Sequence, residues 1–276
     1  MEFTKIHGLG NDYLYIEALE REVPEPGALA PGMCHRRFGV GADGIILVCP
    51  SAIADFRMRI FNADGSEAEM CGNGLRGFGK YVVERGLWKQ ERLSVETGAG
   101  VLAVQVLAED GRVPRARINL GAPRLERADI PMEGPPGRVL DESLRVNGTT
   151  VRVTAVSLGN PHCVIFVDDV AAAPVERLGP EIERHPTFPR RTNVEFVQVL
   201  SRDAVRQRTW ERGSGETWAC GTGAAAVCVA GALTERTARA VRVHLVGGEL
   251  EVEWAADGTV VQTGPTVEVF RGTWPA

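Results

Sequence analysis

Two glycine-rich loops that each lead into a cysteine constrain this sequence most strongly. The first loop, residues 62–74, ends in Cys71-Gly-Asn-Gly, and the second, residues 211–223, ends in Cys220-Gly-Thr-Gly. A helical pattern follows each of them. The two cysteines are separated by 220 − 71 = 149 positions. A chain that repeats so specific a loop is constrained to build the same local structure twice.

The same offset recurs outside the two cysteine loops. It places Asn11 on Asn160 and the apolar run 45–48 on the run 194–197, without a gap. One offset that holds at three separated places indicates a duplicated unit. We therefore expect two related lobes, each presenting one cysteine.

Length and composition exclude several classes of protein. A chain of 276 residues can bury a large core, and no apolar run is long enough for a membrane span. The first residues lack the layout of a signal peptide, so we expect a cytoplasmic protein. The net charge of −5 argues against a nucleic-acid surface. The six cysteines include no Cys-x-x-Cys, so structural zinc is not expected.

Periodicity predicts a mixed α+β fold with the two cysteine loops running into central helices. The segment 224–233 is apolar on all sides, which is typical of a buried helix. The stretch 121–150, rich in proline and glycine, favours a lobe boundary. Each lobe is expected to be a sheet curled around one helix. Strands are predicted at 2–6, 13–18, 45–48, 56–61, 93–96, 101–107, 115–120, 151–157, 163–167, 194–199, 204–210, 240–246, 249–254, 259–263 and 267–270, and helices at 28–38, 72–85, 174–185 and 221–235.

The paired cysteines predict proton transfer at a carbon next to a carboxylate. A thiol at a helix start lies at the positive end of the helix dipole, which favours the thiolate. The amides of Gly72-Asn73 and of Gly221-Thr222 are suited to bind a carboxylate. If one carboxylate lies between both helix starts, one thiolate can remove the α-proton and the other thiol can return a proton to the opposite face. This scheme requires no cofactor.

Several polar residues near the two loops have two interpretations. Asn11 and Asn160 are turn formers by type, but their match under the offset favours substrate contact. His162 is expected at the surface, or else beside a thiol whose pKa it modulates. Glu211 and Arg212 form either an ion pair or a site for a charged substrate.

A long ordered set of motifs resembles the diaminopimelate epimerase family over nearly the whole chain. The resemblance implies cofactor-independent interconversion of LL- and meso-2,6-diaminopimelate, in lysine and peptidoglycan synthesis. It also implies two pseudo-symmetric lobes, each a β-barrel-like, mostly antiparallel sheet around a central helix, with the active site in the cleft between them. The matching motifs are His7-Gly-Leu-Gly-Asn-Asp12, Gly39-Val-Gly-Ala-Asp-Gly44, Phe61-Asn-Ala-Asp-Gly-Ser66, Met70-Cys-Gly-Asn-Gly-Leu-Arg76, Gly159-Asn-Pro-His162, Arg191-Thr-Asn-Val-Glu-Phe196 and Glu211-Arg-Gly-Ser-Gly-Glu-Thr217 with Cys220-Gly-Thr-Gly223.

The resemblance also implies roles for individual residues. Cys71 and Cys220 match the proton-transferring cysteines, and His162 and Glu211 match groups that modulate the thiols. One departure is Gly44, where some members carry a substrate-binding glutamine. The positions that match substrate-binding residues are Asn11, Asn62, Gly72, Asn73, Asn160, Asn193, Glu211, Arg212, Gly221 and Thr222.

The family's architecture further predicts domain limits and assembly. The N-terminal lobe is expected to comprise 1–119 and 266–276, and the C-terminal lobe 120–265. Phe270 falls where some members place a tyrosine at a dimer interface, so we expect a homodimer. The expected partner is a small-molecule substrate, with no cofactor, metal, nucleic acid or membrane.

Three other interpretations are open. A proline racemase or hydroxyproline epimerase also uses two cysteines for proton transfer, but it typically carries histidine at the position of Asn73. Phenazine-type isomerases lack the cysteine pair. A non-catalytic amino-acid-binding protein would explain the duplication and the anion sites, but not a thiol at both equivalent positions.

Overall fold

The computed structural model describes residues 1–275, which separate into two compact units. Unit 1 contains Met1–Asn119 and the chain from Thr263 onward, and unit 2 contains Leu120–Gln262. The chain therefore passes between the units twice. The stretch 121–150, in which a boundary was expected, lies inside unit 2, and the division falls just before it.

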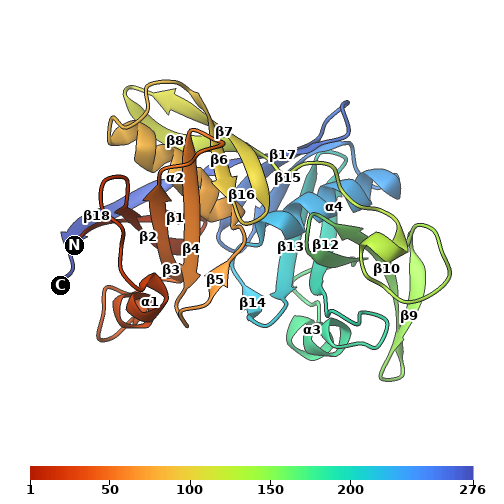
Figure 1. Ribbon diagram of the computed structural model, residues 1–276. Coiled ribbons are helices and arrows are strands. Elements are labelled where there is room, and N and C mark those ends of the chain that lie inside the picture. The colour runs from red at the N-terminus through yellow and green to blue at the C-terminus, as the bar shows by residue number, and fades with distance from the viewer. Residues whose placement is uncertain (276) are drawn as a thin grey trace. The chain divides into compact units, whose positions relative to one another are not determined.

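Unit 1 is a curled, mostly antiparallel sheet with two helices (Figure 1). Its strands pair in the order β18-β1-β2-β3-β4-β6-β7-β8, and β5 pairs with β4. The pairs β2–β3 and β4–β6 are parallel. The elements are β1 (Glu2–Gly8), β2 (Asn11–Glu17), α1 (Pro26–Cys34), β3 (Gly44–Cys49), β4 (Phe56–Asn62), β5 (Glu67–Ala68), α2 (Gly72–Glu84), β6 (Arg92–Thr97), β7 (Gly100–Glu109), β8 (Arg112–Asn119) and β18 (Val267–Thr273).

Unit 2 repeats this arrangement. Its strands pair in the order β9-β10-β11-β12-β13-β15-β16, β14 pairs with β13, and the pairs β11–β12 and β13–β15 are parallel. The elements are η1 (Arg127–Asp129), β9 (Glu142–Val146), β10 (Thr149–Ser157), β11 (Pro161–Phe166), α3 (Val175–Glu183), β12 (Asn193–Ser201), β13 (Ala204–Glu211), β14 (Gly215–Thr217), α4 (Gly221–Leu233), β15 (Ala240–Leu245), β16 (Gly248–Trp254) and β17 (Val260–Pro265), whose last residues belong to unit 1.

The register of strand pairing shows the duplication directly. Tyr13 pairs with Gly44 in unit 1, and His162 pairs with Asn193 in unit 2. Both members of the second pair lie 149 positions after those of the first (13 + 149 = 162, 44 + 149 = 193). The helices α2 and α4 begin and end at the same offset. The predicted fold of two pseudo-symmetric lobes is confirmed.

Each unit encloses one of the helices that follow a cysteine. In α2, Leu75, Phe78 and Val82 are fully buried, and each contributes about 1.5–3 kcal/mol through the apolar surface that it removes from water. A Cβ at Gly77 would lie 2.2 Å from the hydroxyl of Tyr15, so glycine allows the sheet to approach the helix. In unit 2, residues 224–230 of α4 are at most 1% exposed, which confirms the buried helix predicted from its apolar composition.

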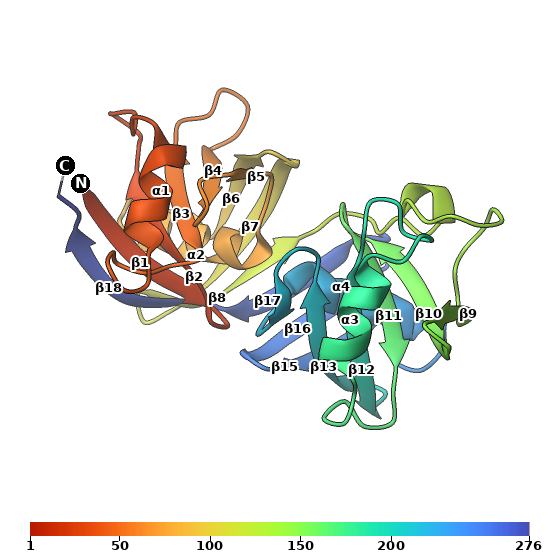
Figure 2. The same ribbon diagram turned by 90° about the horizontal axis from the view of Figure 1, so that it is seen from below.

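The remaining helices lie on the outside of the sheets. Figure 2 shows α1 against β3 and β4, and α3 against β12 and β13. The helix predicted at 28–38 ends earlier, at Cys34, because the chain turns there and the amides of Val40 and Gly41 bond the carbonyl of Met33. Strand β9 was not predicted, since its surroundings are rich in proline and glycine. Within residues 1–275, no helix has the length and apolar character needed to cross a membrane.

Candidate active site

The first half of the candidate site surrounds Cys71 at the start of α2. Cys71 is the N-cap of this helix, and its Sγ accepts a hydrogen bond from the amide of Gly74 at 3.4 Å. The thiol also lies 3.3 Å from Oδ1 of Asn11. The same oxygen accepts a bond from Nδ2 of Asn73 at 3.2 Å. The structure therefore brings together Asn11, Cys71 and Asn73, three of the residues that the sequence analysis assigned to the candidate site.

Two residues that sequence reasoning missed complete this half-site. Asp43 accepts a hydrogen bond of 2.7 Å from Nδ2 of Asn11 and thereby fixes the orientation of that amide. Tyr13 is buried beside the cysteine, and burial raises the pKa of its hydroxyl well above the ordinary value, with Cys71 adding to the effect. Tyr13 is therefore a neutral neighbour of the thiol.

The second half of the candidate site surrounds Cys220 at the start of α4. Cys220 caps this helix as Cys71 caps α2, and its Sγ accepts from the amide of Gly223 at 3.4 Å. The hydroxyl of Thr222 lies 3.7 Å from the sulfur. Only 5% of Cys220 is exposed, whereas Cys71 is partly exposed.

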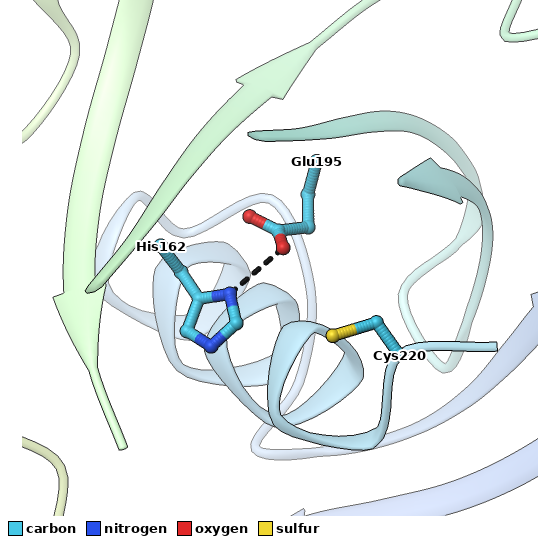
Figure 3. Close-up of side chains that lie close together, drawn as sticks. All are labelled: His162, Glu195 and Cys220. Carbon is cyan, nitrogen blue, oxygen red and sulfur yellow. Dashed lines mark hydrogen bonds and ion pairs between the residues drawn. The ribbon is translucent and has the colours of Figure 1, made fainter. Parts of the chain in front are cut away.

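His162 and Glu195 form a buried pair beside Cys220, as Figure 3 shows. Nδ1 of His162 lies 2.8 Å from Oε1 of Glu195, and both side chains are fully buried. Nε2 of His162 lies 3.1 Å from Oδ1 of Asn160, whose Nδ2 donates to the hydroxyl of Thr222 at 3.1 Å. Of the two interpretations of His162, the surface position is wrong, because β11 is an interior strand whose side chains from 161 to 165 are all buried.

Burial outweighs the helix dipole at Cys220. The pKa of its thiol is raised well above the ordinary value, first by burial and then by the nearby carboxylates of Glu211 and Glu195; the amide of Gly223 only partly opposes this. The helix start favours the thiolate through the amide of Gly223, but burial and the two carboxylates together favour the protonated thiol of Cys220. Burial also raises the pKa of Glu211, while a hydrogen bond from Thr217 lowers it.

The remaining predicted residues lie at or near the two loops and make contacts within the protein. Asn62 donates to the hydroxyl of Ser66 at 3.0 Å. Asn193 is buried, donates to the carbonyl of Pro161 and accepts from the backbone amide of Arg212. The Arg212 side chain is exposed and donates to the carbonyl of Arg190.

The helix starts themselves supply the expected backbone donors. Gly72 and Gly221 are the first residues of α2 and α4, and the first amides of a helix have no partner within the helix itself. The carbonyl of Gly221 accepts a bond of 2.8 Å from Gln262. Each half-site therefore combines a thiol with backbone N–H groups at a positive helix end, which is an arrangement that can bind a carboxylate next to a proton donor or acceptor.

One group of side chains in residues 1–275 has the composition of a metal site. The ligand atoms of His162, Glu195 and Cys220 all lie within 4.8 Å of one another. A metal would require the Cys220 thiolate, which burial opposes, and it would displace the His162–Glu195 hydrogen bond. The absence of a metal stays a prediction.

Glu195 is a third residue of the candidate site that the sequence did not single out. Under the offset it corresponds to Ile46 (195 − 149 = 46), so it is a carboxylate within an apolar strand pattern. That mismatch between the two repeats was the available signal. Its significance emerges only when the strand pairs place it beside His162.

Comparisons with known proteins agree with the geometry. The sequence model described as diaminopimelate epimerase matches residues 3–126 and 154–269. The chain is 59% identical to the diaminopimelate epimerase of Moorella thermoacetica and 57% identical to that of Pelotomaculum thermopropionicum; each alignment covers 100% of this chain and 99% of the relative. A probable proline racemase from Agrobacterium radiobacter K84 shares the fold, with a TM-score of 0.73, 17% identity and coverage of 99% and 92% of the two chains.

Proposed function

Because the chain belongs to the diaminopimelate epimerase family, we propose that it interconverts LL- and meso-2,6-diaminopimelate by inverting one α-carbon. The proposed enzyme is an amino-acid epimerase of lysine and peptidoglycan precursor synthesis. The observation that carries the mechanism is the repeated thiol cap: Cys71 and Cys220 occupy equivalent positions at the starts of two equivalent helices.

In the proposed reaction the substrate α-carbon lies between the two sulfurs. One thiolate takes the α-proton and becomes a thiol, and the electron pair that remains is delocalised into the carboxylate. The opposite thiol then gives its proton to the other face and becomes the thiolate. Protons and charge balance, and the enzyme is left poised for the reverse reaction. The high pKa of Cys220 supports its starting as the proton donor.

The substrate α-carboxylate is proposed to bind at the starts of α2 and α4. The backbone N–H groups at Gly72-Asn73 and Gly221-Thr222 stabilise the additional negative charge that develops there as the proton leaves. The distal amino-acid end is proposed to contact Asn62, Asn193, Glu211 and Arg212. Carboxylates and amide oxygens accept from an ammonium group, and a guanidinium can bind a carboxylate with two bonds.

Incubation with LL-diaminopimelate in D₂O tests this proposal. The wild-type enzyme is expected to incorporate α-deuterium and to produce the meso isomer. Cys71→Ala and Cys220→Ala should each lower turnover by at least about 1000-fold, because each removes one of two obligatory acid/base groups. Cys49→Ala, outside both half-sites, is the matched control and should keep wild-type activity.

The possible outcomes test the proposed mechanism and the proposed substrate separately. Full turnover in either half-site variant would refute the two-thiol mechanism. Turnover of proline but not of diaminopimelate by the wild type would instead identify a proline racemase.

The protein is further proposed to form a homodimer through β18. Val269 and Phe270 on this strand are 52% and 43% exposed, although the Phe270 ring makes an edge-to-face contact with Phe3. Light scattering during size-exclusion chromatography should give twice the chain mass of 29.8 kDa, and Phe270→Ala should shift the mass toward the monomer. A monomeric wild type would exclude the assembly.

A further inference from the structure

Glu195 is a buried carboxylate at a position where the other repeat has an apolar residue. Its side chain is fully buried, and Oε2 has no hydrogen-bond partner within residues 1–275. Burying such a group is unfavourable unless it is fully paired. The equivalent position in unit 1 holds Ile46, which is also fully buried. The same strand is thus built without a carboxylate in one repeat and with one in the other.

Glu195 and Ile46 occupy the same place relative to the central helices. A Cβ at Gly74 would lie 2.7 Å from Cδ1 of Ile46, and a Cβ at Gly223 would lie 2.7 Å from Oε1 of Glu195. Each side chain therefore packs against the first turn of its helix, next to the capping cysteine. Glycine in that turn leaves the room that the carboxylate needs.

A directed chain of hydrogen bonds joins Glu195 to the start of α4. Asn160 donates through Nδ2 to the hydroxyl of Thr222, so its Oδ1 faces Nε2 of His162. An amide oxygen only accepts, so Nε2 must carry a hydrogen. Nδ1 then faces Glu195, and one further proton is shared between this nitrogen and the carboxylate. The orientation of the Asn160 amide and the hydrogen on Nε2 of His162 are therefore coupled.

We propose that Glu195 is a positioning residue of the second half-site. Its carboxyl group holds His162 with a hydrogen on Nε2, and His162 in turn holds the Asn160 amide toward Thr222 in the first turn of α4. This inference rests on the proposed function, because that turn is the proposed site of the substrate carboxylate. The first repeat needs no such chain, since Asp43 orients Asn11 there through a direct bond of 2.7 Å.

Two substitutions at Glu195 test the proposal. In Glu195→Gln, the amide can donate to Nδ1, so His162 keeps its hydrogen on Nε2 and kcat/KM should stay within about tenfold of the wild type. In Glu195→Leu, Nδ1 of His162 has no partner, so the Asn160 amide is no longer held toward Thr222. We expect kcat/KM to fall about 100-fold and KM to rise, since losing one oriented hydrogen-bond donor in an active site has an effect of about this size. Glu142→Gln, which alters the ion pair with Arg127 elsewhere in unit 2, is the control.

Histidine NMR provides a readout that does not depend on turnover. In ¹⁵N-histidine-labelled protein the His162 signal, assigned by comparison with His162→Gln, should show hydrogen on Nε2 in the wild type and in Glu195→Gln. In Glu195→Leu no group at position 195 favours either ring nitrogen and the Asn160 amide can turn over, so the signal should show a mixture of the two tautomers. Unchanged signals and kinetics in Glu195→Leu would overturn the proposal. So would a 100-fold loss in Glu195→Gln with an unchanged His162 signal, because the carboxylate would then act through its charge on Cys220.

Two further cases remain decisive. If Glu195→Leu does not fold, a His162 signal in Glu195→Gln that has lost the hydrogen on Nε2 still overturns the proposal. If the wild type does not turn over diaminopimelate, the proposed function fails, and the histidine signals of the two variants test the positioning role by themselves.

Discussion

At the scale of residues, the two half-sites share a plan but differ in charge. Cys71 has the neutral, buried Tyr13 as its neighbour, at the position where unit 2 has His162 (13 + 149 = 162). Cys220 instead lies beside two carboxylates, Glu211 and Glu195. A reaction that inverts a carbon in both directions needs two acid/base groups, one protonated and one not. The two carboxylates beside Cys220 favour its being the protonated one.

Removing one of these carboxylates should make Cys220 more reactive. Burial and the charge of Glu211 both raise the thiol pKa, so in Glu211→Gln that pKa should fall and more thiolate should be present at pH 8. We expect alkylation of Cys220 by iodoacetamide to become about three- to tenfold faster, since one pKa unit is a tenfold change in thiolate.

Mass spectrometry of the Cys220 peptide measures this rate. The charge-matched control is Glu249→Gln, whose carboxylate is exposed and pairs with His244, and it should leave the rate unchanged. A slower reaction in Glu211→Gln would mean that Glu211 does not raise the pKa of Cys220.

At the scale of elements, each of the two candidate thiols is placed by a helix start in which an added Cβ would make close contacts. The caps depend on the third residue of each helix, since Gly74 and Gly223 donate their amides to the sulfurs. In unit 2 a Cβ at Gly223 would lie 2.7 Å from Oε1 of Glu195 and 3.2 Å from Sγ of Cys220. Alanine forms helices better than glycine, so we attribute glycine at this position to the space that Glu195 and Cys220 occupy.

Gly223→Ala should therefore damage the site more than the fold. The methyl group must displace Glu195 or Cys220, so we expect a loss of stability of about 1–3 kcal/mol and a fall in kcat of about 100-fold. Denaturant unfolding and kinetics measure the two effects.

The matched control is Gly32→Ala in α1, where a Cβ would meet nothing within 4 Å. This change should stabilise the protein by about 0.5–1 kcal/mol and leave activity unaltered. Wild-type kcat in Gly223→Ala would show that the close contact is not important for catalysis.

At the scale of the whole molecule, the end of the chain completes unit 1. Strand β18 pairs with β1 over most of its length. The terminal amine of Met1 also donates to the carbonyl of Trp274 at 2.7 Å. The unit that carries Cys71 is therefore assembled from both ends of the sequence, whereas unit 2 is one continuous segment.

A chain that ends at Pro265 should lose structure in unit 1 alone. Without β18, the edge of β1 loses its hydrogen-bond partners and Phe3 loses its contact with Phe270. Hydrogen exchange should become faster in β1 and β2, while α4 and β12 stay protected. A chain that ends at Trp274 is the control. Equal loss of protection in both units would show that they unfold as one.

The sequence by itself determined that the chain is duplicated, where the two central helices lie, and which two of the six cysteines begin them. The offset of 149 residues specified them because repeated loops and apolar patterns fold into the same local structure. The tertiary structure alone decided the environment of each thiol. His162 became a core residue and Glu195 its partner because strand pairing brings β11 and β12 side by side. Burial, a property of packing and not of spacing, then raised the pKa of Cys220 against the helix dipole.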